Sequence, residues 1–103
     1  MSRFFRASVS QDVSTLELVV EIPDHLYAYY ENLNEIASRT VAQRWRELHP
    51  NQDDPPRLPQ HFKIEGLSDF DPGSVALGFG PFEFPGGTRV WITKPIPSLF
   101  IPN

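Results

Sequence analysis

The chain has 103 residues, with 13 Asp and Glu against 9 Lys and Arg, a net charge of −4 and no Cys. This length suits one domain, and a content of 40% hydrophobic residues excludes a disordered tail. The lack of Cys excludes a disulfide framework, thiolate metal sites and cysteine nucleophiles. No apolar run approaches the roughly 18 residues of a membrane helix, and no signal-peptide pattern is present, so we expect a soluble cytoplasmic protein without membrane binding.

Turn-forming residues are distributed unevenly. Of 11 Pro, only Pro23 lies before residue 50, and all 6 Gly lie after it. Because neither half is long enough to fold alone, we interpret residues 1–103 as a single domain. Its expected parts are a hairpin and helix (1–49), a Pro-rich linker (50–61), a set of strands (62–94) and an extended tail (95–103).

The first two predicted elements are strands that pair as a hairpin around a polar turn at residues 10–14. The first covers residues 3–9. In the second, four apolar residues alternate with the outward-facing set Thr15, Glu17, Val19 and Glu21. The apolar set is Leu16, Leu18, Val20 and Ile22. A period of two with acidic residues outward is typical of a half-buried antiparallel strand.

An amphipathic helix is predicted over residues 24–48. Pro23 and Asp24 are residues that commonly start a helix, and Pro50 disfavours its continuation. No Gly or Pro interrupts the interval. Apolar residues recur there at spacings of three and four, which marks a core-facing stripe. The stripe consists of Leu26, Tyr30, Leu33, Ala37, Val41, Trp45 and Leu48.

Three further strands are predicted after the linker. A short one includes Phe62 and Ile64, and a return strand covers residues 89–94, with Trp91 facing away from its apolar neighbours. Between them, Val75, Leu77 and Phe79 alternate in one phase and Phe82 and Phe84 in the other, with a bulge or break at 80–81. The resulting order, ββαβββ, predicts an α+β fold in which one long helix packs on a mostly antiparallel sheet.

One alternative is a dimeric DNA-binding regulator. Residues 16–48 resemble, in outline, the ribbon-helix-helix family, with an alternating strand, a helix and an inter-helix turn near Ser38 and Arg39. The resemblance implies that strands of a dimer read bases in the major groove. Two features depart from the family: Ser38 stands where the turn usually has Gly, and Glu17 and Glu21 would face phosphates. We therefore do not expect direct nucleic-acid binding.

Catalytic and metal-binding patterns are absent from the sequence. The histidines His25, His49 and His61 show no metal-ligand spacing, and no nucleophile-elbow, phosphate-loop or zinc-protease motif occurs. We therefore expect no cofactor, no metal and no catalytic residue. A small ligand-binding domain or enzyme, with a pocket between helix and sheet, stays open as a second alternative.

Aromatic and apolar residues outside the central pattern are the candidate contact groups. Tyr and Trp with nearby Arg dominate binding hot spots. The tail is apolar yet spaced by Pro, so it must dock on its own sheet, swap onto a second copy or enter a partner's groove. The predicted partner-binding residues are Tyr27, Tyr29, Arg44, Trp45, Trp91, Leu99 and Phe100.

These expectations favour a small non-catalytic protein-binding module. It would act as an adaptor, inhibitor or regulatory subunit by occluding a surface of another protein or of a protein–nucleic acid complex, and it could form a homodimer. Compact acidic chains of this kind also suit factors encoded by phages or mobile elements that block a host's nucleic-acid machinery.

Overall fold

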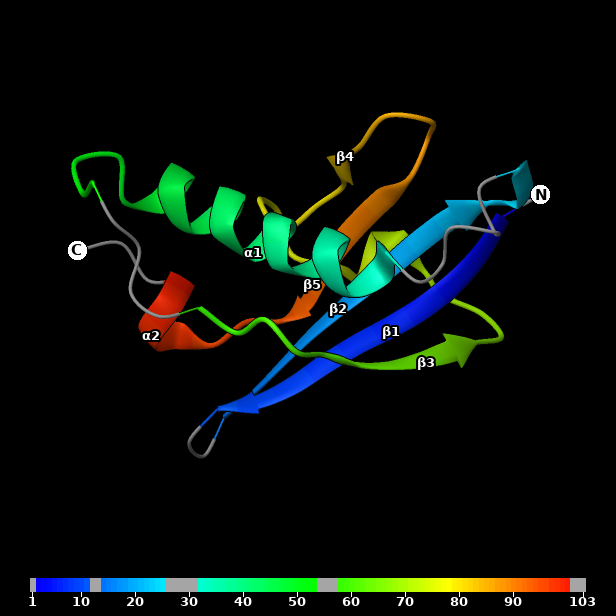
Figure 1. Ribbon diagram of the computed structural model, residues 1–103, viewed down its shortest axis with the longest axis horizontal. Coiled ribbons are helices and arrows are strands. Elements are labelled where there is room, and N and C mark those ends of the chain that lie inside the picture. Colours follow the sequence, from blue (N-terminus) through cyan, green and yellow to red (C-terminus); the bar gives the residue numbers. More distant parts are fainter. Residues whose placement is uncertain (1, 12–13, 26–31, 54–57, 101–103) are drawn as a thin grey trace.

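The computed structural model describes residues 2–11, 14–25, 32–53 and 58–100. Every strand pair in them is antiparallel, and the strand order in the sheet is β3-β1-β2-β5-β4. The predicted α+β fold and its N-terminal hairpin are confirmed (Figure 1). The elements are β1 (Ser2–Gln11), β2 (Ser14–Pro23), α1 (Leu33–Leu48), β3 (Lys63–Leu67), the 3₁₀ turn η2 (Pro72–Ser74), β4 (Phe82–Glu83), β5 (Arg89–Lys94) and α2 (Pro97–Phe100).

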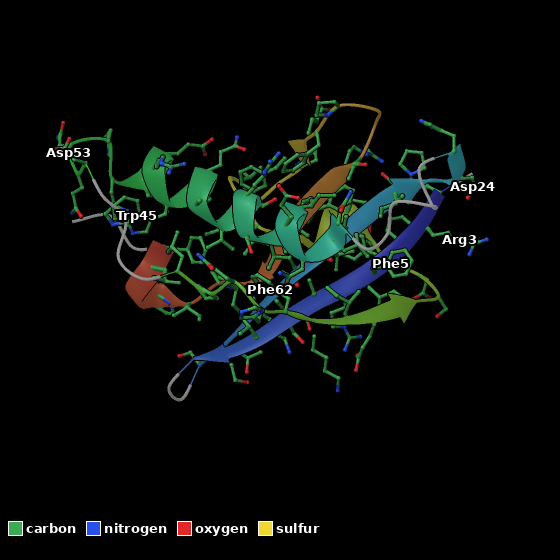
Figure 2. All side chains as sticks on the ribbon, in the orientation of Figure 1. Arg3, Phe5, Asp24, Trp45, Asp53 and Phe62 are labelled. Carbon is green, nitrogen blue, oxygen red and sulfur yellow. The ribbon has the colours of Figure 1, made fainter. Side chains whose placement is uncertain are left out.

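Helix α1 lies across one face of the sheet, which we call the core face (Figure 1). The four apolar residues of β2 predicted to point inward are each at most 2% exposed. Side chains of α1 meet them at the expected helical spacing, and Figure 2 shows Phe62 between α1 and the strands. The buried residues of α1 are Leu33, Ala37, Thr40, Val41 and Trp45.

The helix is shorter than predicted. It begins at Leu33, after Asn32, and not near Asp24. Residues 26–31, which include Leu26 and Tyr30 of the predicted stripe, lie outside the described residues. None of the helices in the described part of the chain has the length and apolar character needed to cross a membrane.

The structure does not have the helix break that the ribbon-helix-helix alternative requires. Helix α1 continues without a break through Ser38 and Arg39, where that motif needs a turn between two helices. In addition, β2 lies between β1 and β5 in the interior of its own sheet. Both edges of β2 are therefore already paired, and it cannot form the two-stranded ribbon of a dimer.

The opposite face of the sheet, which we call the outer face, carries a small apolar cluster. Val19 and Trp91 are each 2% exposed although they point away from α1. The ring of Phe70 covers this region, with its centroid 5.1 Å from that of Trp91 and 5.7 Å from that of Phe4. The segment after β3 therefore folds back over the outer face.

Two predictions about the C-terminal half need correction. Residues 75–79 form no strand, and β4 has only two residues. The tail is not extended throughout, because Pro97–Phe100 forms the short helix α2, with Pro97 at its first position. Ile96, Leu99 and Phe100 are 3–5% exposed and belong to the main core. Up to residue 100, the tail thus docks on its own chain.

Candidate functional site

Most of the residues predicted to bind a partner are buried within this chain. Tyr27 and Tyr29 lie outside the described residues. Of the others, Trp45, Trp91, Leu99 and Phe100 are 2–5% exposed. Direct contact with a partner through these four side chains would require the residues that cover them to move away. The contact surface proposed below is therefore built from other residues.

Trp45, near the end of α1, is buried because neighbouring residues of its own chain cover it (Figure 2). Its ring stacks on His49, with centroids 4.6 Å apart and planes at 19°. The backbone N–H of His49 also donates to the Trp45 carbonyl at 3.0 Å. His49, which is 7% exposed, therefore terminates the helix and covers Trp45 from solvent.

Arg44 packs along the surface of its own chain. Its guanidinium carbon lies 5.1 Å from the centroid of the Phe79 ring, and Nη1 lies 3.3 Å from Oε2 of Glu47. The side chain is 18% exposed, and its buried Nε has no hydrogen-bond partner among the described residues. A Cβ atom added at Gly78 would lie 2.9 Å from Nη2. Arg44 is thus a brace against residues 78–79.

The segment braced by Arg44 is a loop with an exposed apolar tip. Leu77 is 99% exposed and is the one large hydrophobic side chain in the described part of the chain that lies open to solvent. The Phe79 N–H donates to the Ala76 carbonyl at 3.2 Å, and Gly78 has φ 87°. The hydrogen bond closes a four-residue turn whose third position, Gly78, has positive φ, a conformation that favours Gly. We call residues 75–81 the Leu77 loop.

The base of the Leu77 loop is held firmly on its C-terminal side. Phe79 accepts a hydrogen bond at its carbonyl from the Ile92 N–H at 2.8 Å, and its ring meets Phe100 edge-on at 6.1 Å. At Gly80, a Cβ atom would lie 2.6 Å from Cδ1 of Trp91, so only Gly fits there.

On its N-terminal side, the loop follows the turn η2. The Asp71 carboxylate accepts from the Gly73 N–H at 3.0 Å, and the Asp71 carbonyl accepts from the Ser74 N–H at 3.1 Å. These hydrogen bonds lie within residues 71–74, so they order the turn itself, whereas the Leu77 loop is held against the rest of the chain through residues 78–80. A contact group whose position is set before a partner arrives binds at a lower entropic cost.

Two hollows flank the Leu77 loop. The one beside α1 has a volume of about 390 Å³ and a partly charged lining, whereas the one beside β5 has about 220 Å³ and a mainly apolar lining. The first is lined by Gln43, Arg44, Glu47, Gly78, Gly80, Pro81, Phe82 and Glu83. The second is lined by Ser74, Val75, Ala76, Phe79, Ile92, Thr93 and Pro95. The exposed tip and both hollows form one irregular surface.

A third hollow, of about 250 Å³, lies between α1 and the sheet, where the ligand-binding alternative needs a pocket. Its charged groups, Glu35 and Arg39, are paired with each other at 2.6 Å on the helix surface. This volume is below the range of about 300–1,000 Å³ common for ligand sites, whereas the hollow of about 390 Å³ beside the Leu77 loop lies within it. Among the described residues, no group of three His, Cys, Asp or Glu side chains could hold a metal ion.

The outer face carries charged groups that are largely satisfied within the chain. Glu21 accepts hydrogen bonds from Arg89 at 2.6 Å and from Ser2 at 2.7 Å. Glu17 accepts from the Thr93 hydroxyl at 2.7 Å and lies 3.6 Å from Nε of Arg6. The sequence predicted the outward direction of both glutamates, and these contacts link β2 to β1 and β5.

Comparison with models of known protein families, with curated proteins and with solved structures gives no match. The geometry of the molecule is therefore the basis for a functional proposal. The sequence pattern had placed Leu77 on a strand face beside Val75 and Phe79. The signal that could have revealed its exposure is Gly78, which directly follows Leu77 and permits the turn.

Proposed function

We propose that this chain is a small non-catalytic protein-binding module that contacts its partner through the Leu77 loop. It would act in the cytoplasm as an adaptor, inhibitor or regulatory subunit by occluding a partner surface. The single observation that carries the proposal is the position of Leu77, 99% exposed at the tip of a loop that Arg44 and Ile92 hold through Phe79.

The energetics of such a contact rest on one apolar anchor. Burying a leucine side chain that is otherwise exposed contributes about 2 kcal/mol, or about 30-fold in Kd. A lone exposed leucine is common on protein surfaces. Here, the contact of Arg44 with Phe79 holds the loop that carries Leu77. The two hollows beside the loop could receive side chains of a partner. The partner class is a protein with an apolar pocket for a leucine side chain.

The test is affinity capture from a lysate of the source organism with three tagged baits: the wild-type chain, Leu77→Asp and Asn51→Asp. Both variants add one negative charge at an exposed position, but Asn51 lies in the segment after α1 and is not part of the Leu77 loop. We expect wild type and Asn51→Asp to retain the same stoichiometric protein, and Leu77→Asp to lose it.

Folding is the necessary control for this comparison. Because Leu77 contributes almost no buried surface, thermal unfolding of Leu77→Asp should occur within about 2 °C of wild type. Equal retention of the partner by folded Leu77→Asp would overturn the proposed surface. Turnover of a small molecule by the purified chain, without a partner, would overturn the non-catalytic assignment.

A further inference from the structure

Strand β3 forms one margin of the sheet. It pairs with β1 on one side, with Ile64 opposite Ala7 and Glu65 opposite Arg6. On its other side, no described strand pairs with it, and Figure 1 shows β3 at the border of the sheet. The backbone N–H and C=O groups along such an edge are available for hydrogen bonds to a further strand.

Side chains of opposite charge lie next to each other along this edge. Lys63 and Glu65 point to the same face, with Nζ and Oε1 3.0 Å apart, and their side chains are 76% and 43% exposed. Lys63 lowers the pKa of Glu65, chiefly through its hydrogen bond and charge, and the charge of Arg6 adds to this effect. Glu65 is therefore ionised at neutral pH, and β3 carries one positive and one negative group on the outer face.

We propose that β3 pairs antiparallel with β3 of a second copy of this chain, in the register that places Ile64 opposite its own equivalent. In this register, Lys63 of each copy faces Glu65 of the other, which gives two cross-strand pairs of opposite charge. The two five-stranded sheets then join into one continuous sheet.

The charges select this register over its neighbours. Symmetric pairing centred on Lys63 would place two lysines opposite each other, and pairing centred on Glu65 would do the same for two glutamates. Like charges directly opposite each other destabilise a strand pair. Of these three registers, only the one centred on Ile64 pairs opposite charges.

The same register meets open space at Gly66. Its next pair places Phe62 of one copy opposite Gly66 of the other. A Cβ atom at Gly66 would meet nothing within 4 Å, so a neighbouring strand can approach there without displacing a side chain. A small edge interface of this kind suits a weak dimer.

Dimerisation through β3 leaves the Leu77 loop accessible. The loop is bonded to β5 through Phe79 and Ile92, and β5 lies on the opposite side of the central β1–β2 pair from β3. A dimer would present two such loops and could bind a multivalent partner with increased avidity. The inference stands independently of the proposed function, because Leu77→Asp should leave self-association unchanged.

The test is sedimentation equilibrium of the wild-type chain, Lys63→Glu, Glu65→Lys and the double swap, each from about 10 μM to 1 mM. We expect a concentration-dependent monomer–dimer equilibrium for wild type. Each single variant should raise the dimer dissociation constant about 10- to 30-fold, because it makes both cross-strand pairs repulsive. The double swap should return to within about threefold of wild type.

A wild-type chain that stays monomeric to 1 mM would overturn the proposal, as would single variants that dimerise as well as wild type. Failure of the double swap to restore dimerisation would also contradict this register. Urea unfolding at 5 μM serves as the folding control. NMR spectra should show concentration-dependent shifts at residues 63–67, and shifts confined to other elements would overturn the interface.

Discussion

The side-chain amide of Asn34 ties helix α1 to the segment that leads into β3. Its Nδ2 donates to the Gln60 carbonyl at 2.5 Å, and its Oδ1 accepts from the Phe62 N–H at 2.7 Å. An amide presents one donor group and one acceptor side by side, so it satisfies two backbone groups as a neighbouring strand would. Asn34 therefore helps to position the segment entering β3 against the helix.

Asn34→Asp should destabilise the fold by about 1 kcal/mol at pH 7. The variant keeps an acceptor for the Phe62 N–H but places a carboxylate oxygen against the Gln60 carbonyl, which leaves two acceptors facing each other. This contact raises the pKa of the new carboxyl group in the folded state. The deficit should therefore shrink as the pH falls through that pKa, because the protonated group can donate again.

Urea unfolding at pH 7 and pH 4 measures this effect, with Asn51→Asp as the matched substitution at an exposed position. After subtraction of the wild-type stability at each pH, the control should show little change. A deficit for Asn34→Asp that is equal at both pH values would show that the contact with Gln60 does not govern this site.

The sequence predicted which way the glutamates of β2 point but not which residues they contact on the outer face. The alternation in β2 correctly indicates that Glu17 and Glu21 point away from the core. Their partners Thr93 and Arg89 lie 76 and 68 positions away in the sequence. No local pattern links residues at such separations, so the Glu17–Thr93 hydrogen bond and the Glu21–Arg89 ion pair follow only from the strand order.

At the scale of elements, the C-terminal segment contributes directly to the main core. Ile96, Leu99 and Phe100 are 3–5% exposed, and α2 packs near α1. Burying three large apolar side chains stabilises a fold by roughly 5–9 kcal/mol. That is comparable with the entire stability of an ordinary domain, about 5–15 kcal/mol.

Deletion of residues 95–103 should therefore unfold the chain, and Phe100→Ala alone should cost about 3–5 kcal/mol. Circular dichroism and urea unfolding measure both effects. Leu77→Ala is the control, since it removes a large apolar side chain that is 99% exposed and should change stability by less than about 0.5 kcal/mol. A truncated chain with the thermal stability of wild type would contradict this role for the tail.

Two elements show where sequence patterns were insufficient. Asp24 and Asn32 are both side chains that commonly begin helices, and the pattern alone did not indicate that α1 starts after the second. The alternation of Val75, Leu77 and Phe79 matches a strand, yet positive φ angles at Gly78 and Gly80 break it. Because the sequence pattern predicted a strand here, it did not indicate that Leu77 lies at the tip of a loop, and the candidate site was missed.

At the scale of the whole molecule, the element order predicted the fold class but not the arrangement of the sheet. The hairpin β1–β2 follows from adjacency and alternation. The placement of β5 beside β2, and of β3 beside β1, depends on contacts between distant segments. The sequence also allowed three positions for the tail: on its own sheet, on a second copy or in a partner's groove. In the structure, the three large apolar side chains of residues 96–100 pack in the core of their own chain.

The molecule has two candidate contact regions, one at the β3 edge of the sheet and one beside β5, on the other side of the central β1–β2 pair. The edge of β3 is polar in side chains and offers backbone hydrogen bonds, whereas the Leu77 loop offers an apolar anchor. Because these chemistries differ, self-association and partner binding should respond to different substitutions. The charge swaps at β3 and the changes at Leu77 separate the two activities experimentally.

The most direct measurement of the central claim is site-specific photo-crosslinking in cells of the source organism. A photoreactive amino acid replaces Leu77 in one version of the chain and Asn51, an exposed residue outside the loop, in another. We predict that position 77 gives one dominant covalent adduct with a different protein and that position 51 gives none. Adducts of equal yield from both positions, or an adduct at position 77 only with a second copy of this chain, would contradict the account.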